Sequence, residues 1–132
     1  MVKLVYCIRR RADVPPVEFG RYWLEKHGPL VRSVASAIGA CRYVQSHVVH
    51  DDLNAMLRAS RGAAAPWDGI TEVWWEDRAA LERGLSEPDG QDAARRLLED
   101  EATFIDFAQS SLFLTEEHEI FDFTRGGVGR GA

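Results

Sequence analysis

The sequence predicts an α+β protein in which helices cover one face of a four-stranded antiparallel sheet. Two-residue alternation of apolar side chains marks the strands, and three- and four-residue spacing marks the helices. The elements follow in the order strand, helix, strand, strand, helix, strand, which is the βαββαβ arrangement of a ferredoxin-like fold. With 132 residues, 45% of them apolar, the chain has room for one core, and we expect a single domain over residues 1–122.

The first half of the chain predicts two strands around a kinked helix. The strands alternate and are rich in β-branched and aromatic residues, whereas Pro15 and Pro16 suit a first helical turn. Pro29 lacks an amide donor and follows Gly28, so the helix should kink or restart there. The expected elements are a strand at 2–9, helices at 15–26 and 30–38, and a strand at 41–50.

The second half predicts an insertion followed by strand, helices and strand. Residues 51–67 are longer than a hairpin needs and contain one helical turn that Asp51 or Asp52 can cap, and long loops of this kind often cover binding sites. The expected elements are a strand at 70–76, helices at 78–85 and 91–107 separated by Pro88, and a strand at 111–121. Residues 123–132 are rich in glycine, so we expect a disordered tail.

Polar groups interrupt the apolar faces of both long helices. Phe19, Trp23 and His27 follow at four-residue steps, and His27 lies near the middle of an apolar arc roughly 140° wide. A buried imidazole without a partner costs about 1–3 kcal/mol, so it needs a hydrogen bond or a function. Glu101 lies inside the apolar arc of the later helix. Glu72 lies on a strand, where alternation alone does not tell which face of the sheet carries it.

These groups predict a candidate catalytic site formed by His27, Glu101 and Glu72. A histidine beside a carboxylate within apolar walls can act as a general acid or base on a carbonyl or a phenol without a cofactor or a metal. The expected substrate-binding residues are Phe19, Trp23, Trp74, Tyr6 and Tyr43. A structural alternative stays open, in which His27 donates to a backbone carbonyl freed at Pro29 or ties two helices together through Glu101.

Composition argues against several classes of partner. The net charge of −5 comes from interspersed acids and bases without a basic stripe, so nucleic acid is not an expected partner. The sequence has neither an apolar run of about 20 residues nor a leader peptide, so we expect a cytoplasmic protein without a membrane partner. His47, His50 and His118 lack metal-ligand spacing, and no motif for covalent haem attachment is present.

One face of the predicted sheet has no helix to cover it. Strands this rich in Val, Tyr, Trp and Phe would expose an apolar patch larger than the few hundred Å² usual for a monomer. We therefore expect a homodimer that stacks two such faces.

Four local motifs carry a family resemblance over about residues 3–121. They are Phe19…Tyr22-Trp23…His27-Gly28-Pro29-Leu30, Asp68-Gly69-Ile70…Glu72-Val73-Trp74-Trp75, Asp100-Glu101…Phe104-Ile105-Asp106 and Thr115-Glu116-Glu117. In these motifs the chain resembles the EthD family, named for ethyl tert-butyl ether degradation, within the dimeric α+β barrel superfamily. The resemblance implies a dimeric barrel. The family includes fungal relatives that decarboxylate or dehydrate aromatic polyketides without a cofactor, so the resemblance also implies chemistry of this kind.

The residues and the resemblance together predict a cofactor-free acid/base enzyme of decarboxylase, dehydratase or isomerase type. Its expected substrate is a small hydrophobic or aromatic carbonyl compound from catabolism or polyketide metabolism. One alternative is a non-catalytic protein that binds hydrophobic molecules and assists a degradation pathway. A second alternative is a haem- or oxygen-dependent monooxygenase, because the superfamily also includes such enzymes.

Overall fold

The computed structural model describes residues 1–124 and contains one four-stranded sheet with strand order β2-β3-β1-β4. Every pair of neighbouring strands is antiparallel. The strands are β1 (Val2–Ile8), β2 (Arg42–His47), β3 (Gly69–Trp75) and β4 (Ser111–Glu116). This topology confirms the ferredoxin-like fold class. The predicted tail is described only at residues 123 and 124, and the rest of it lies outside the described residues.

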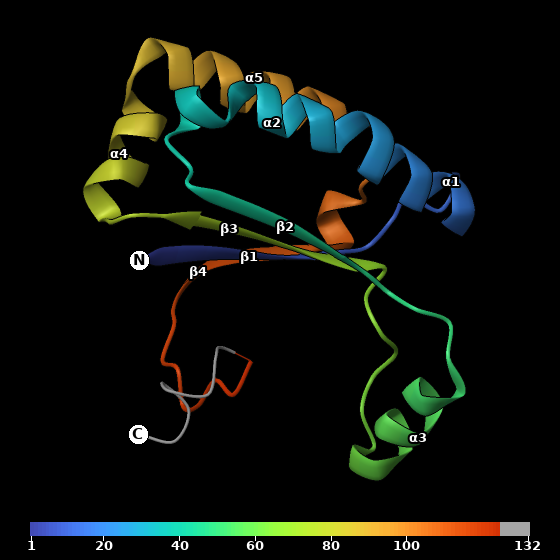
Figure 1. Cartoon of the computed structure of the whole chain (residues 1–132). Helices are drawn as coiled ribbons and strands as arrows, with labels where there is room; N and C mark the ends of the chain where they lie inside the picture. The colour runs from blue at the N-terminus through green and yellow to red at the C-terminus, as the bar shows by residue number, and fades with distance from the viewer. Residues whose placement is uncertain (125–132) are drawn as a thin grey trace.

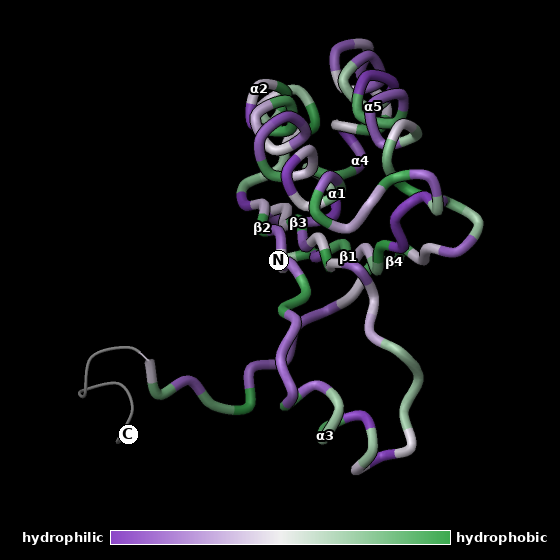
Figure 2. The backbone as a smooth tube through the Cα atoms, turned by 90° about the vertical axis from the view of Figure 1, so that its right-hand side faces the viewer, coloured by the Kyte–Doolittle hydropathy of each residue, from purple (hydrophilic) through white to green (hydrophobic). Residues whose placement is uncertain are grey.

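The helices of the predicted core lie together on one face of the sheet (Figure 1). They are α1 (Pro16–Tyr22), a π-helical turn η1 (Trp23–His27), α2 (Gly28–Ile38), α4 (Arg78–Ser86) and α5 (Pro88–Glu101). Figure 2 shows α2 and α5 side by side above the strands. Pro88 begins α5 instead of separating two helices, because the first helical turn needs no amide donor from it.

Two predicted elements end five or more residues earlier than expected. The helix predicted to reach residue 107 ends at Glu101, and a short 3₁₀ helix, η2 (Phe107–Gln109), follows. Between them the backbone turns back to the sheet, where the amide of Asp106 donates to the carbonyl of Arg9 at 2.9 Å. Strand β4 ends at Glu116 instead of residue 121, because Glu116 pairs with Val2, the first residue of β1, and its partner strand begins there.

Strand alternation places the core between the sheet and the helices. On β1, Tyr6 and Ile8 point toward the helices and are buried, and on β3 the same is true of Thr71, Val73 and Trp75. Gly69 begins β3 where the Trp23 ring packs against its backbone. A Cβ atom at this position would lie only 2.4 Å from Cζ3 of Trp23, so the Asp-Gly start of the strand leaves space for the indole.

The insertion at 51–67 contains more structure than the sequence predicts. It forms a ten-residue helix, α3 (Asp52–Arg61), on the side of the sheet opposite the other helices (Figure 1). Residues 117–124 lie on that same side. We call the face of the sheet that carries no core helix the outer face. Within residues 1–124, every helix is too short or too polar to cross a bilayer.

Candidate functional site

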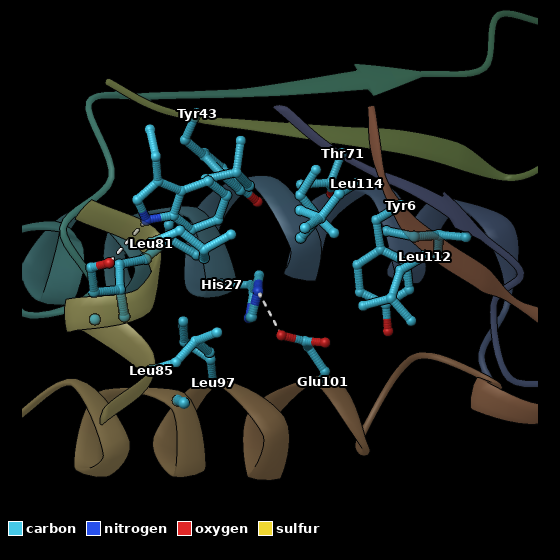
Figure 3. Close-up of a pocket in the computed structure, with 18 of the residues that line it drawn as sticks. Tyr6, His27, Tyr43, Thr71, Leu81, Leu85, Leu97, Glu101, Leu112 and Leu114 are labelled. Carbon is cyan, nitrogen blue, oxygen red and sulfur yellow. Dashed lines mark hydrogen bonds and ion pairs between the residues drawn. The ribbon is translucent and has the colours of Figure 1, made fainter. Parts of the chain in front are cut away.

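An apolar cavity of about 380 Å³ lies between the sheet and the helices. Its lining comes from all four strands and from η1, α2, α4 and α5, and Figure 3 shows His27 pointing into it. The polar residues of the lining are Tyr6, His27, Tyr43, Thr71 and Glu101. The volume falls at the lower end of the roughly 300–1,000 Å³ usual for small-molecule sites. The cavity therefore fits a small hydrophobic molecule with few polar groups.

Exposed lining residues mark the mouth of this cavity. Leu112 and Leu114 of the edge strand β4 are 57% and 49% exposed, and Leu85 at the end of α4 is 63% exposed. Leu97 of α5 is half-buried opposite them. The opening of the cavity therefore lies between the edge strand β4, the end of α4 and α5.

The π-helical turn positions His27. The amide of Gly28 donates to the carbonyl of Trp23, five residues earlier, and the side-chain Nε2 of Gln45 donates to the same carbonyl at 2.8 Å. Pro29, which lacks an amide, follows directly and fits the first turn of α2. The turn buries both Trp23 and His27, which are 1% and 4% exposed. Turns of this kind are rare and often occur at functional sites.

Asp100 fixes the orientation of the His27 ring. The Nδ1 atom of His27 lies 2.7 Å from Oδ2 of Asp100, and the hydroxyl of Tyr22 donates to the other oxygen of that carboxylate. Because a carboxylate only accepts, the hydrogen bond assigns the proton of the neutral imidazole to Nδ1. The lone pair of Nε2 then faces the cavity.

Glu101 lies on the other side of the ring. Its Oε2 atom lies 3.9 Å from Nε2 of His27, a contact drawn in Figure 3. Burial raises the pKa of Glu101 to about 7, an effect that a hydrogen bond from Tyr6 opposes. Burial lowers the pKa of His27, although the neighbouring Asp100 acts in the opposite direction. Near neutral pH the cavity thus contains a carboxyl group able to donate a proton and an imidazole nitrogen able to accept one.

Three of the five predicted substrate-binding residues line the cavity, namely Tyr6, Trp23 and Tyr43. The Tyr43 hydroxyl accepts a hydrogen bond from Nε2 of Gln45 at 2.9 Å, and burial raises the pKa of this phenol. Phe19 instead packs in the core, where its ring centroid lies 5.5 Å from that of Trp23. It supports the cavity wall from behind and is not part of the lining.

Glu72 and Trp74 lie on the outer face of the sheet, so the structure does not bring them together with His27. Thr71, Val73 and Trp75 take the inward positions of β3, and alternation sends Glu72 and Trp74 to the opposite face. Oε2 of Glu72 accepts from Nζ of Lys3 at 2.8 Å, while Nε1 of Trp74 donates to Glu117. The expectation that Glu72 and Trp74 belong to the His27 site is therefore corrected.

Asp100, Thr71 and Gln45 belong to the site but were not among its predicted residues. Asp100 stands beside Glu101 in the last turn of α5, about 100° around the helix, so the apolar arc does not include it. The sequence signal that could have indicated Asp100 is its position next to Glu101, as an adjacent pair of carboxylates at the end of a helix. Thr71 was not predicted as a site residue because alternation does not distinguish the two faces of a strand.

Three further histidines, His47, His50 and His118, are not expected to bind a metal ion. The His47 ring packs against Trp23 in a tilted arrangement with centroids 4.3 Å apart, and its Nε2 lies 2.8 Å from Oε1 of Gln45. Among residues 1–124, no group of three or more His, Cys, Asp or Glu side chains lies close enough together to hold a metal ion.

Comparisons with known proteins agree with this architecture. The sequence profile of the EthD domain matches residues 11–108. An EthD family protein from Bacillus halodurans superimposes with a TM-score of 0.60 at 18% identity, over 89% of this chain and 99% of that one. A dimeric protein of unknown function and ferredoxin-like fold from Bacteroides fragilis gives a TM-score of 0.55 at 12% identity, over 88% of this chain and 95% of that one.

A third similar structure is SnoaB from Streptomyces nogalater, a cofactor-independent oxygenase. It gives a TM-score of 0.51 at 16% identity, over 89% of this chain and 93% of that one. No curated protein matches the sequence. At these identities the structural similarities show the fold, whereas the profile covers most of the chain and shows the family. The chain therefore belongs to the EthD family.

Proposed function

We propose that the protein is a cofactor-independent acid/base enzyme of isomerase, dehydratase or decarboxylase type. Its substrate is a small hydrophobic or aromatic molecule with a carbonyl or phenol oxygen. The observation that carries the proposal is that His27 and Glu101 face one apolar cavity with Nε2 and Oε2 3.9 Å apart. Among the described residues, the lining includes no Lys or Arg, which favours a neutral substrate over an anion. Isomerisation and dehydration therefore fit better than decarboxylation of a carboxylate.

The two groups divide the proton transfers between them. Nε2 of His27 takes a proton from the carbon next to the carbonyl, while protonated Glu101 gives its proton to the carbonyl oxygen. The products of this step are a neutral enol, an imidazolium and a carboxylate, so protons and charge balance. Return of the imidazolium proton to another carbon, or its transfer to a leaving hydroxyl, completes an isomerisation or a dehydration.

Asp100 supports this chemistry through its hydrogen bond with His27, and Tyr43 supports it from the cavity lining. Asp100 accepts the Nδ1 proton of His27 and would stabilise the imidazolium that forms. Because the oxygen of the Tyr43 hydroxyl already accepts from Gln45, its own hydrogen remains available for the oxygen of a substrate. In this proposal Tyr43 orients the substrate, and the leucines and tryptophans of the lining exclude water.

We further propose that the chain forms a homodimer through the outer faces of its sheets. The half-buried Val5, Cys7 and Ile70 lie there, together with Phe113, which is 46% exposed. Burial of these side chains against a second copy would remove apolar surface from water. The dimeric state of the B. fragilis protein of the same fold supports this arrangement.

Hydrogen exchange at carbon tests the proposed chemistry without knowledge of the natural substrate. In heavy water, the protein should accelerate exchange of the protons next to the carbonyl of 1-indanone or 1-tetralone, followed by proton NMR. His27→Gln should lower the rate roughly 10²–10⁴-fold because it removes the base, and Glu101→Gln should lower it through loss of the acid. Glu72→Gln is the matched control, because Glu72 lies on the other face of the sheet.

The outcomes separate the alternatives. An exchange rate unchanged by His27→Gln would refute the role of this residue as a base. Tight binding of the ketones, read from quenching of Trp23 and Trp75 fluorescence, without any exchange would favour the non-catalytic binding protein. That alternative is supported by the apolar lining itself. Oxygen consumption that depends on added aromatic substrate would favour a monooxygenase.

A further inference from the structure

We propose that α3 is an arm that clasps a second copy of this chain, so that contacts between the outer faces are only part of the interface. This inference rests on the homodimer proposed above and adds to it an element outside the sheet. Three observations carry it: the arm has a defined structure, it presents an unpaired apolar face, and it projects on the side where the second copy would lie.

Both ends of α3 are well defined. At its start, Oδ1 of Asp51 accepts from the amide of Leu53 at 2.8 Å. At its end, Gly62 adopts the left-handed conformation with φ of 60°, and Nε of Arg58 donates to the carbonyl of Ala63 at 3.0 Å. The segment is thus a helix with a specific beginning and end.

The base of the arm is fixed to the end of β1. The guanidinium of Arg9 donates to the carbonyl of Pro66 at 2.9 Å and stacks over the Trp67 ring at 4.6 Å. The carboxylate of Asp68 accepts from the amide of Arg10 at 2.9 Å. These contacts give the arm a set direction relative to the sheet.

The apolar face of α3 is uncovered in the single chain. Leu53, Met56 and Leu57 are 60%, 66% and 61% exposed, and their spacing places them within an arc of about 100°. An isolated helix of fewer than about 12 residues is marginal in water, so a ten-residue helix depends on packing of such a face. The structure thus presents a formed helix whose stabilising contact must come from outside the single chain.

The area of the outer face indicates which molecule supplies that contact. Four strands of about six residues present a footprint of about 19 Å by 20 Å, or about 400 Å². A stable interface buries about 800 Å² on each partner. Figure 1 shows α3 and residues 117–124 on the side of the outer face, and Ile120, Phe121 and Phe123 of that segment are 86%, 71% and 54% exposed. A second copy on the outer face would reach these elements, which supply the missing area.

The connection to the arm is long enough for this contact. Residues 48–51 lead from β2 to α3, and four extended residues span up to about 13 Å. Stacked sheets lie about 10 Å apart. The connection is therefore long enough for the helix to begin at the depth of a partner sheet, where its apolar face can pack against the flank of the second copy.

Sedimentation equilibrium over a dilution series tests the clasp with the full chain. The wild type should have a mass near twice 14.8 kDa. The variant Leu53→Ser/Met56→Ser/Leu57→Ser should raise the dimer dissociation constant at least ~100-fold, because three apolar contacts are lost together. The matched control Ala55→Ser/Ala59→Ser changes the opposite face of the same helix and should leave the constant within about threefold of the wild type. Circular dichroism checks that each variant is folded.

Each outcome bears on one part of the proposal. A dimeric wild type whose dissociation constant changes equally little in both variants would overturn the clasp and leave the sheet-to-sheet dimer standing. Equal weakening in both variants would also overturn it, since the effect would then come from helix propensity and not from the apolar face. A monomeric wild type at micromolar concentration would overturn the dimer and the clasp together. None of these results affects the acid/base chemistry, which the exchange experiment tests separately.

Discussion

At the scale of residues, burial acts in opposite directions on the two proposed catalytic groups. It raises the pKa of the Glu101 carboxyl and lowers the pKa of the His27 imidazole, so both are favoured in their neutral forms. A neutral pair suits an apolar cavity that binds a neutral ligand. Charge then develops only when a proton moves, and Asp100 lies at Nδ1 of His27 to stabilise the imidazolium.

Glu101→Gln should change how stability depends on pH. The pKa of Glu101 rises from 4.5 to about 7 on folding, so between these values the folded state keeps a proton that the unfolded state has released. The free energy of unfolding of the wild type should therefore fall as pH rises through this window, by on the order of 3 kcal/mol from this group. Glutamine stays neutral, so Glu101→Gln should gain about that much relative to the wild type between pH 4.5 and pH 8.

Urea unfolding at several pH values measures this difference. The contribution of His27 is present in both proteins and cancels in the comparison to first order. Glu99→Gln is a suitable control, because its exposed carboxylate pairs with Arg95 at the surface of the same helix. Parallel stability curves for the wild type and Glu101→Gln would show that Glu101 does not carry a raised pKa.

At the scale of elements, the contact between η1 and the start of β3 sets the position of the site. The Trp23 ring lies against the backbone of Gly69 and packs against the tilted His47 ring, so the turn and these two strands hold each other in place. Gln45 adds a hydrogen bond from β2 to the carbonyl of Trp23. The orientation of His27 thus depends on residues of both strands.

Gly69→Ala should destabilise the fold and displace this turn. The added methyl would lie 2.4 Å from the Trp23 ring, and overpacking of this kind costs about 1–3 kcal/mol. Gly20→Ala is the control, because its methyl would meet only the His47 side chain at 3.7 Å and alanine favours the helix. Urea unfolding and the near-UV circular dichroism of the tryptophans measure both effects. Equal stability of the two variants would mean that Trp23 does not rest on Gly69.

Sequence patterns predicted some of these elements better than others. The order of strands and helices followed from periodicity, and His27 and Glu101 were recognised because each lies within the apolar arc of a helix. Periodicity did not decide which face of β3 the helices cover, and this ambiguity left Glu72 in the predicted site. Asp100 takes its place in the site through a contact between η1 and the end of α5 that is distant in sequence, so helical periodicity alone did not assign it.

At the scale of the whole molecule, the cavity opens at the sheet edge formed by β4 while the outer face points away from it. Stacking of two outer faces would therefore leave the mouth of each cavity accessible. The proposed ligand site and the proposed dimer interface thus lie on separate surfaces. Each can be measured without disturbing the other.

A small aromatic ketone should stabilise the protein by occupying the cavity. At one hundred times its dissociation constant, 1-tetralone should raise the free energy of unfolding by about 2.7 kcal/mol. Leu97→Trp places a larger side chain in the lining and should remove most of this gain, whereas Leu98→Trp changes the next residue, which is 56% exposed and not part of the lining. Thermal unfolding with and without ligand measures the difference. Equal stabilisation of the two variants would place the ketone elsewhere.

The π-helical turn η1 cannot be replaced by a regular α-helical turn without a change in the packing of the helix before it. Its hydrogen bond from Gly28 to Trp23 spans five residues, so the turn holds one residue more than an α-helical turn. Deletion of one residue between them would restore regular spacing and rotate the preceding helix by about 100° relative to α2. Trp23 could then not pack against Gly69 while His27 points into the cavity. The extra residue of the turn thus allows the imidazole to face the cavity while Trp23 stays packed against the start of β3.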